Sequence, residues 1–292
     1  MEINLESGKY IVAVSGGVDS VVLLDILSKQ KNIELAVAHF DHGIRKDSKS
    51  DNQFVKRLAM KYELIFYTER AELGPNASED LARRARYAFL DNSKQTFGAS
   101  AIITAHHQDD LLETATFNIL RGTGRKGINS LKSTKTIIRP LLSYTKKDLI
   151  DYALENKLIW VEDKTNLDTK YARNYIRHKM LAGLSKNSKN RFIDIVNRTG
   201  RINNQLDTQL AKQINEHEIE GGLDRYWFIM LPHDVSEEIM AYWLRQNKLG
   251  SFDKKTIQRS VIAAKTFQPG KQSELYSNAK LNIGHKTIKI NF

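Results

Sequence analysis

A short apolar segment that runs into a glycine turn constrains the fold of this chain more than any other feature. Residues 10–14 (YIVAV) are apolar and rich in β-branched side chains, as is typical of a buried parallel strand. The sequence SGGVDS (residues 15–20) follows, and residues 21–27 (VVLLDIL) have the pattern of a helix. Glycines let a ligand approach the backbone, and a helix directs its free N–H groups at that ligand. The pattern therefore predicts a phosphate-binding turn; the alternative is an ordinary glycine turn capped by serines.

Strand-like and helical segments alternate along the first 121 residues. The expected strands are 10–14, 35–40, 64–68 and 101–105, and the expected helices are 21–27, 51–62, 78–92 and 108–121. Such alternation predicts the α/β class, with a parallel sheet and helices on both of its faces. Ligands of these folds bind beyond the carboxyl ends of the strands. The glycine turn and the polar segments 39–45 and 106–113 all fall at that edge.

The charge and the cysteine content narrow the function. Lys plus Arg total 45 against 34 Asp plus Glu, a net charge of +11, and the surplus lies in two blocks. Residues 121–147 hold eight basic and no acidic residues, and residues 170–201 hold nine basic and one acidic. These blocks favour a polyanionic partner over a merely solvated surface. The absence of Cys excludes disulfides, Cys-ligated metal and thiol chemistry. No apolar run is long enough to span a membrane, so we expect a cytoplasmic protein without a membrane partner.

Several motifs together resemble a known family. SGGVDS resembles the PP-loop of N-type ATP pyrophosphatases; it is neither a Walker A loop nor the dinucleotide GxGxxG pattern. The other motifs are DHGIR (41–45), ARRARY (82–87), TAHHQDDLLET (104–114), RGTG (121–124) with Gly127, RPLL (139–142), DKTNLD (163–168) and RNYIR (173–177). In order and spacing, over residues 10–180, they resemble tRNA(Ile)-lysidine synthetases. The resemblance implies a Rossmann-like fold of the adenine nucleotide alpha hydrolase type.

The resemblance also implies a reaction. ATP adenylates the C2 oxygen of the wobble cytidine in tRNA-Ile with a CAU anticodon, and pyrophosphate leaves. The ε-amine of free L-lysine then attacks C2 and displaces AMP, which forms lysidine. The modified tRNA reads AUA instead of AUG, and its identity changes from methionine to isoleucine. Mg²⁺ is the implied cofactor. PP-loop enzymes often pair, so a homodimer is one expectation, although the sequence does not show the oligomeric state.

The resemblance and the residue chemistry together give the candidate site. The residues expected to bind ATP are Ser15, Gly16, Gly17, Val18, Asp19 and Ser20. The catalytic candidates are Asp41, His106, Asp110 and Glu113. On a helix the last three would share one face, where carboxylates can hold a lysine ammonium, accept its proton and bind metal. Asp19 and Asp110 are the candidates for Mg²⁺. Asp41 is a candidate for lysine recognition or a strand-end turn, and His107 for a capped helix start.

Basic residues outside this site are candidates for contact with RNA. They are Arg83, Arg86, Arg121, Arg125, Lys126, Arg173, Asn174 and Arg177. For Arg83 and Arg86 the alternatives are contact with ATP and a solvated helix face with Glu79 and Asp80 as partners.

We expect three parts in the chain: a PP-loop catalytic domain at 1–190, a connecting helix at 191–214 and a small helical or α+β domain that binds tRNA at 215–292. Two other functions stay open. One is a different PP-loop enzyme, such as a GMP or NAD synthetase-like amidating enzyme. The other is a non-catalytic tRNA-binding protein.

Overall fold

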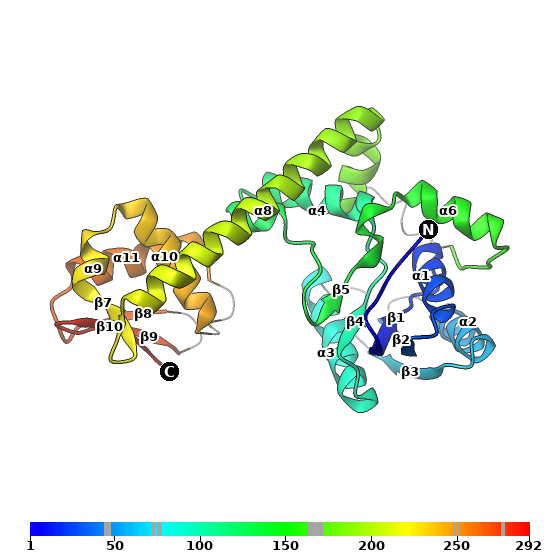
Figure 1. Cartoon of the computed structure of the whole chain (residues 1–292), viewed down its shortest axis with the longest axis horizontal. Coiled ribbons are helices and arrows are strands. Elements are labelled where there is room, and N and C mark those ends of the chain that lie inside the picture. Colours follow the sequence, from blue (N-terminus) through cyan, green and yellow to red (C-terminus); the bar gives the residue numbers. More distant parts are fainter. Residues whose placement is uncertain are drawn as a thin grey trace. The chain divides into compact units, whose positions relative to one another are not determined.

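The computed structural model describes residues 1–43, 48–71, 74, 78–162, 172–247, 249, 252–275 and 278–292 (Figure 1). The motif at 163–168 and the end of the motif at 41–45 lie outside these residues. The chain divides into two compact units, Met1–Thr199 and Gly200–Phe292. No helix in the described part is long and apolar enough to cross a membrane.

The first unit is built on a five-stranded parallel sheet in the order β3-β2-β1-β4-β5. The strands are β1 (Gly8–Ala13), β2 (Ile33–Asp41), β3 (Ile65–Arg70), β4 (Ala101–Ile103) and β5 (Ile137–Ile138). The predicted α/β class is therefore confirmed. The strand β5 was not among the predicted strands, because its two residues carry too little pattern to identify a strand.

Helices cover both faces of this sheet, because successive strand residues point to opposite sides. The helices that cover it are α1 (Val18–Ser28), α2 (Ser48–Lys61), α3 (Glu79–Phe97) and α6 (Lys146–Glu155), whereas α4 (Gln108–Leu120) follows β4 and packs with later segments. Val12 of β1 packs in one core with residues of α1, α2 and α6, whereas its neighbour Ile11 packs in another with Phe89 and Leu90 of α3. Both Val12 and Ile11 are completely buried.

Shorter helical segments follow α4 along the chain. They are α5 (Arg125–Ile128), a 3₁₀ turn at Pro140–Ser143, α7 (Ala172–Tyr175) and a π-helical segment at Ile176–Leu181. Leu112 of α4 packs with Ile176, Leu181 and Ile193, so α4 and the π-helical segment share one small core. The helix α8 (Lys186–Glu216) then runs without a break over the residues at which the two units divide.

The second unit has an antiparallel sheet in the order β6-β7-β10-β9-β8. Its strands are β6 (Glu218–Ile219), β7 (Gly222–Asp224), β8 (Gln272–Glu274), β9 (Lys280–Ile283) and β10 (Thr287–Asn291). Its helices are α9 (Arg225–Met230), α10 (His233–Gln246) and α11 (Lys254–Thr266). Phe228, Trp243 and Leu281 pack together in the core of this unit. The α+β character predicted for the C-terminal part is therefore confirmed.

One buried arginine joins three elements of the second unit. The Arg225 guanidinium donates hydrogen bonds to the carbonyl oxygens of Ala264, Phe267 and Gly284. Ala264 belongs to the last turn of α11 and Phe267 follows it, so the cation satisfies carbonyl groups that a helix end leaves without partners.

Candidate active site

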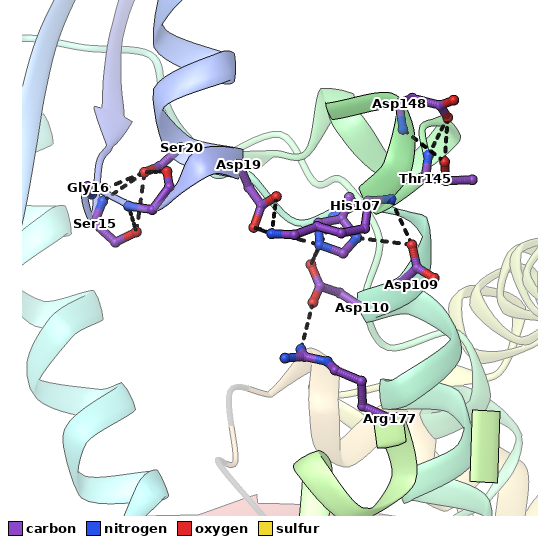
Figure 2. A network of polar contacts seen from close by, with 12 residues as sticks. Ser15, Gly16, Asp19, Ser20, His107, Asp109, Asp110, Thr145, Asp148 and Arg177 are labelled. Carbon is purple, nitrogen blue, oxygen red and sulfur yellow. Dashed lines mark hydrogen bonds and ion pairs between the residues drawn. The ribbon is translucent and has the colours of Figure 1, made fainter. Parts of the chain in front are cut away.

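The glycine turn has the conformation of a loop made to surround an anion. Gly16 has a φ of +95°, a backbone conformation that residues with a side chain rarely adopt. The Ser20 hydroxyl accepts hydrogen bonds from the amides of Ser15 and Gly16, both at 3.2 Å, and donates to the Gly17 carbonyl at 2.9 Å. The loop amides are thus already directed at an oxygen atom inside the turn (Figure 2).

The N-termini of three helices meet beside this turn (Figure 2). Asp19 in the first turn of α1 accepts hydrogen bonds from the Lys146 ammonium at 2.7 and 2.8 Å, one on each carboxylate oxygen. Lys146 is the first residue of α6, and its backbone amide donates to Asp109 of α4 at 2.8 Å. His107 precedes α4, and its Nε2 lies 3.7 Å from an Asp19 oxygen. The positive ends of three helix dipoles point to one place and attract an anion, whereas the carboxylates in their first turns oppose one unless cations offset them.

A second contact fixes α1 and α6 side by side. Asp25 and Tyr152 lie six residues beyond Asp19 and Lys146, and the Tyr152 hydroxyl donates to the Asp25 carboxylate at 2.7 Å. Lys29 and Tyr62 donate to the same carboxylate at 2.6 and 2.7 Å. Burial alone would raise the pKa of Asp25, but these three donors together hold it below its usual value.

His107 lies among three carboxylates. The capped helix start predicted for it is confirmed, because its amide donates to Asp110 at 2.9 Å. Its buried ring also lies 3.6–3.7 Å from oxygens of Asp19, Asp109 and Asp110. His107 therefore connects the glycine turn to α4, a role that the sequence did not indicate.

Glu113 and Arg177 form a buried ion pair with two hydrogen bonds. The distances are 2.5 Å from Nε to Oε1 and 2.9 Å from Nη2 to Oε2, and the Glu113 side chain is 3% exposed. Burial raises the pKa of Glu113 in spite of the arginine. Arg177 also lies 3.8 Å from Asp110, whose side chain is 23% exposed. Of the two predicted carboxylates, Asp110 is thus the more accessible one.

His106 does not share a helix face with Asp110 and Glu113, so that prediction was wrong. The helix α4 begins at Gln108, and His106 lies before its N-cap. The His106 Nδ1 and the Thr104 hydroxyl are 2.8 Å apart. Burial, with the charges of Arg139, Arg86 and Arg83, lowers the pKa of His106 to about 3. The imidazole is therefore neutral at physiological pH and acts as a hydrogen-bonding group.

Asp41 is the last residue of β2 and is buried. Its carboxylate accepts a hydrogen bond from the Gly43 amide at 2.8 Å and lies 3.7 Å from Arg70. The strand-end turn considered for Asp41 is thus present. It leaves the second carboxylate oxygen facing a cation.

The predicted RNA-binding residues of α3 both lie near an aromatic ring. The guanidinium carbons of Arg83 and Arg86 lie 4.8 and 5.5 Å from the centre of the Tyr87 ring. The described ion pair of Asp80 is with Arg84, at 2.7 Å. Because the charges of Arg83 and Arg86 also act on His106, both side chains belong to the surroundings of the site.

The remaining predicted RNA-binding residues follow α4 or pack against it. Arg121 and Arg173 approach the Phe117 ring at 5.3 and 5.2 Å. Arg125 and Lys126 belong to α5, and Asn174 belongs to α7 beside Arg173.

The residues that sequence reasoning missed come from distant parts of the chain. Lys146 contacts Asp19 across 127 positions, so no local pattern links them. One signal was available, because a cation in the first turn of a helix opposes the helix dipole and needs a compensating partner. Asp109, which bonds the Lys146 amide across 37 positions, and Arg139, whose charge acts on His106, were missed for the same reason of distance.

The donor set fits Mg²⁺ only together with a ligand. In the described part of the chain no three His, Asp or Glu side chains are grouped to hold a metal. Asp19 and Asp110 supply carboxylate oxygens, which Mg²⁺ prefers, but Mg²⁺ is usually held by one or two carboxylates plus substrate phosphates. These residues fit such a shared site.

The comparisons with known proteins agree with this geometry. Residues 2–184 match the PP-loop domain family, so the chain is a PP-loop protein. It is 32% identical over 98% of its length to a tRNA(Ile)-lysidine synthase of Clostridium acetobutylicum, of which it covers 67%. It is 36% identical over 87% of its length to that of Thermosipho africanus, of which it covers 62%. The chain belongs to the tRNA(Ile)-lysidine synthase family, which confirms the resemblance found in the sequence.

Two further comparisons describe extent and fold. The chain spans 45% of the length of the relative from Thermotoga maritima, at 37% identity. Among solved structures, the U34-tRNA thiolase NcsA from Methanococcus maripaludis with its [4Fe-4S] cluster has a TM-score of 0.55 and 16% identity, over 68% of this chain and 73% of that one. This likeness supports the fold alone.

Proposed function

We propose that this protein ligates L-lysine to C2 of the wobble cytidine in tRNA-Ile with a CAU anticodon, at the expense of ATP. The observation that carries the proposal is the meeting of three helix N-termini at the glycine turn, next to the carboxylate of Asp110. The helix ends suit a triphosphate, and the carboxylate suits an amine that must lose a proton. The family to which the chain belongs supports the same chemistry.

The reaction has two balanced steps. The C2 oxygen of the cytidine attacks the α-phosphorus of ATP, and the bond to the departing pyrophosphate breaks. The ε-amine of lysine then attacks C2, the bond from C2 to oxygen breaks, and AMP leaves with that oxygen. The lysine ammonium loses two protons in the second step, one before the attack and one after it.

In the first step the amides of the glycine turn and the Lys146 ammonium hold the pyrophosphate portion of ATP. These groups offset the negative charge of the pyrophosphate, so its departure is favoured. To bind it, Lys146 must turn part of its hydrogen bonding from Asp19 to the phosphate. A bound Mg²⁺ would supply further charge neutralisation, held by Asp19 and Asp110.

In the second step Asp110 is the proton acceptor that we favour, and Asp41 is the second carboxylate for recognition of lysine. Glu113 holds Arg177, which in turn lies near Asp110. His106 stays neutral and offers its free ring nitrogen for a hydrogen bond to a substrate.

The basic residues around the site support tRNA as the partner. Arg83 and Arg86 lie on α3, and Arg121, Arg125, Lys126, Arg173 and Asn174 lie on and after α4. We further propose that the second unit contributes to tRNA binding, that the protein acts in the cytoplasm, where its substrates meet, and that it pairs as a homodimer. Light scattering on a sizing column measures the molar mass in solution and so tests the homodimer.

The decisive experiment combines the protein with labelled lysine, ATP and a tRNA-Ile transcript with a CAU anticodon. We expect label in the RNA together with AMP and pyrophosphate. Transfer that occurs without tRNA would point to a small-molecule ligase, and no transfer would remove the proposal. Asp110→Asn should lower kcat by about 100-fold or more and leave tRNA affinity within about twofold. The exposed Asp151→Asn on α6 is the matched control.

A further inference from the structure

The sheet of the second unit has one face packed against helices and one face that is polar. Leu281 and Ile283 of β9 and Ile288 of β10 are buried in the core with α10 and α11. Because neighbouring strand residues alternate, Asn282 and Lys289 point to the opposite side, and they stand directly across from one another in the antiparallel pair. The helices therefore cover only the other side of this sheet.

The polar face carries a cavity of about 310 Å³. Side chains on two strands and the segment that leads into β8 line it, including Lys271, Asn282, Thr287, Lys289 and Asn291. None of the residues that line it is acidic. In the described part of the chain, neither Lys271 nor Lys289 has an ion-pair partner.

Two details indicate that the cavity is prepared for an acceptor. The Asn282 side-chain nitrogen Nδ2 is buried and has no hydrogen-bond partner among the described residues. A buried amide without a partner is costly, and a ligand with acceptor oxygens removes that cost. The stem of Lys289 lies against Gly222 of β7, where a Cβ would be only 2.7 Å from its Cγ. The same Cβ would lie 2.5 Å from the Ile288 carbonyl oxygen, so both the backbone and the lysine stem require glycine here.

The positive charge of the second unit lies in its C-terminal half, which includes β8, β9 and β10 of this sheet and also α11 on the other side of it. Residues 248–292 contain nine basic and two acidic residues, whereas residues 200–247 contain four basic and eight acidic. Residues 248–292 are therefore a third basic segment, separate from the two basic blocks at 121–147 and 170–201. It favours a polyanion over a neutral ligand.

We propose that this cavity binds a backbone phosphodiester of the RNA substrate. Lys271 and Lys289 supply the positive charge, and the Asn282 amide donates a hydrogen bond to a phosphate oxygen. The inference rests on the proposed function for the identity of the RNA. It assigns to the second unit a contact that is independent of the anticodon chemistry.

The test measures tRNA affinity at a series of salt concentrations for Lys271→Ala/Lys289→Ala. We expect the affinity to fall about tenfold and the slope of log affinity against log salt to shrink by about one unit per lost phosphate contact. Lys271→Arg/Lys289→Arg should restore both. Lys254→Ala/Lys255→Ala removes the same charge from exposed positions on α11 and is the matched control, with an expected change below about twofold.

A second measurement follows the cavity itself. Asn282→Asp keeps the shape and adds a negative charge, so it should weaken tRNA binding more than the lysine control does. In the ¹⁵N-labelled full-length protein, the Asn282 side-chain amide signal should shift when tRNA is added. A shift with inorganic pyrophosphate and none with tRNA would mean that the cavity takes a free anion, and it would overturn the inference.

The two proposals fail separately. If the wild-type protein transfers lysine and the cavity variants bind tRNA with unchanged affinity and slope, the phosphate site is wrong and the proposed function stands. If the wild-type protein binds tRNA through the cavity but transfers no lysine, the proposed function is wrong and the site stands. If it binds no RNA, both are wrong.

Discussion

Replacing Arg177 with glutamine is expected to destabilise the first unit by about 2 kcal/mol at neutral pH. The substitution removes both guanidinium hydrogen bonds from Glu113, whose side chain is only 3% exposed. Removal of one partner of a buried ion pair costs about 3–5 kcal/mol. The Arg177 side chain is 38% exposed, so water screens part of that interaction and the lower figure follows.

The effect should depend on pH in a defined direction. Burial already raises the folded-state pKa of Glu113 above its usual value of 4.5, and Arg177 limits the rise. Without the arginine, the folded-state pKa rises further. A raised folded-state pKa favours the folded protein below the unfolded-state pKa, and that contribution is lost as pH rises through the folded value. The variant should therefore be close to wild type near pH 4 and most destabilised near pH 7.5.

Urea unfolding followed by circular dichroism at these two pH values measures the difference. Glu113→Gln/Arg177→Gln should recover most of the lost stability, since two neutral amides leave no buried charge unpaired. An equal loss at both pH values would refute the reasoning, because the penalty would then not come from the Glu113 charge. A double variant as unstable as Arg177→Gln alone would also refute it.

The other predictions concern the glycine turn, the buried Asp25 and the loop after α4. Gly16→Ala should lower the free energy of unfolding, measured without ATP, by about 1–2 kcal/mol, because the φ of Gly16 is +95°. Gly17 has an extended backbone, so Gly17→Ala should change the free energy of unfolding by less than about 0.5 kcal/mol. Equal losses in the two variants would contradict this explanation. Asp25→Asn should cost about 1–2 kcal/mol at pH 7 in urea unfolding. Since the folded pKa of Asp25 lies below 3.8, this cost should shrink as pH falls through it, and a constant cost would contradict the explanation. Arg125→Ala/Lys126→Ala should weaken tRNA binding and reduce the salt slope by about one unit per lost contact; an unchanged slope would mean that α5 does not touch phosphate.

Local patterns predicted the first four strands and the helices α1 to α4, but they were weaker at the ends of elements. The helix expected at 78–92 continues to Phe97, where Gly98 in a left-handed conformation ends it. The start of α4 was predicted at Gln108, yet His106, which precedes that start, was expected to share a helix face with Asp110 and Glu113. The Asp110 carboxylate accepts from the His107 amide and so places the N-cap after His106. Capping contacts of this kind decide where a helix begins, and hydrophobic periodicity does not detect them.

The sequence located the edge of the sheet at which the site lies, but not the pairing of charges there. Topology explains the success, because the carboxyl ends of parallel strands meet at one edge. The failure has a physical cause too. Whether Glu113 faces substrate or Arg177 depends on how a π-helical segment 64 residues later packs on α4. Contacts of that range follow from tertiary packing and leave no local pattern.

The first turns of the three helices at the site explain why a cation is needed there. Each first turn already holds at least one carboxylate, contributed by Asp19, by Asp109 with Asp110, and by Asp148. Asp109, Asp110 and Asp148 accept hydrogen bonds from backbone amides at the helix starts, whereas Asp19 pairs with the Lys146 ammonium. All four carboxylates would repel a triphosphate. Lys146 bridges two of them, since its ammonium binds Asp19 and its amide binds Asp109. A triphosphate can therefore bind only if cations offset both its own charge and that of the carboxylates. Lys146 and a metal shared with the phosphates would together supply the positive charge that this requires.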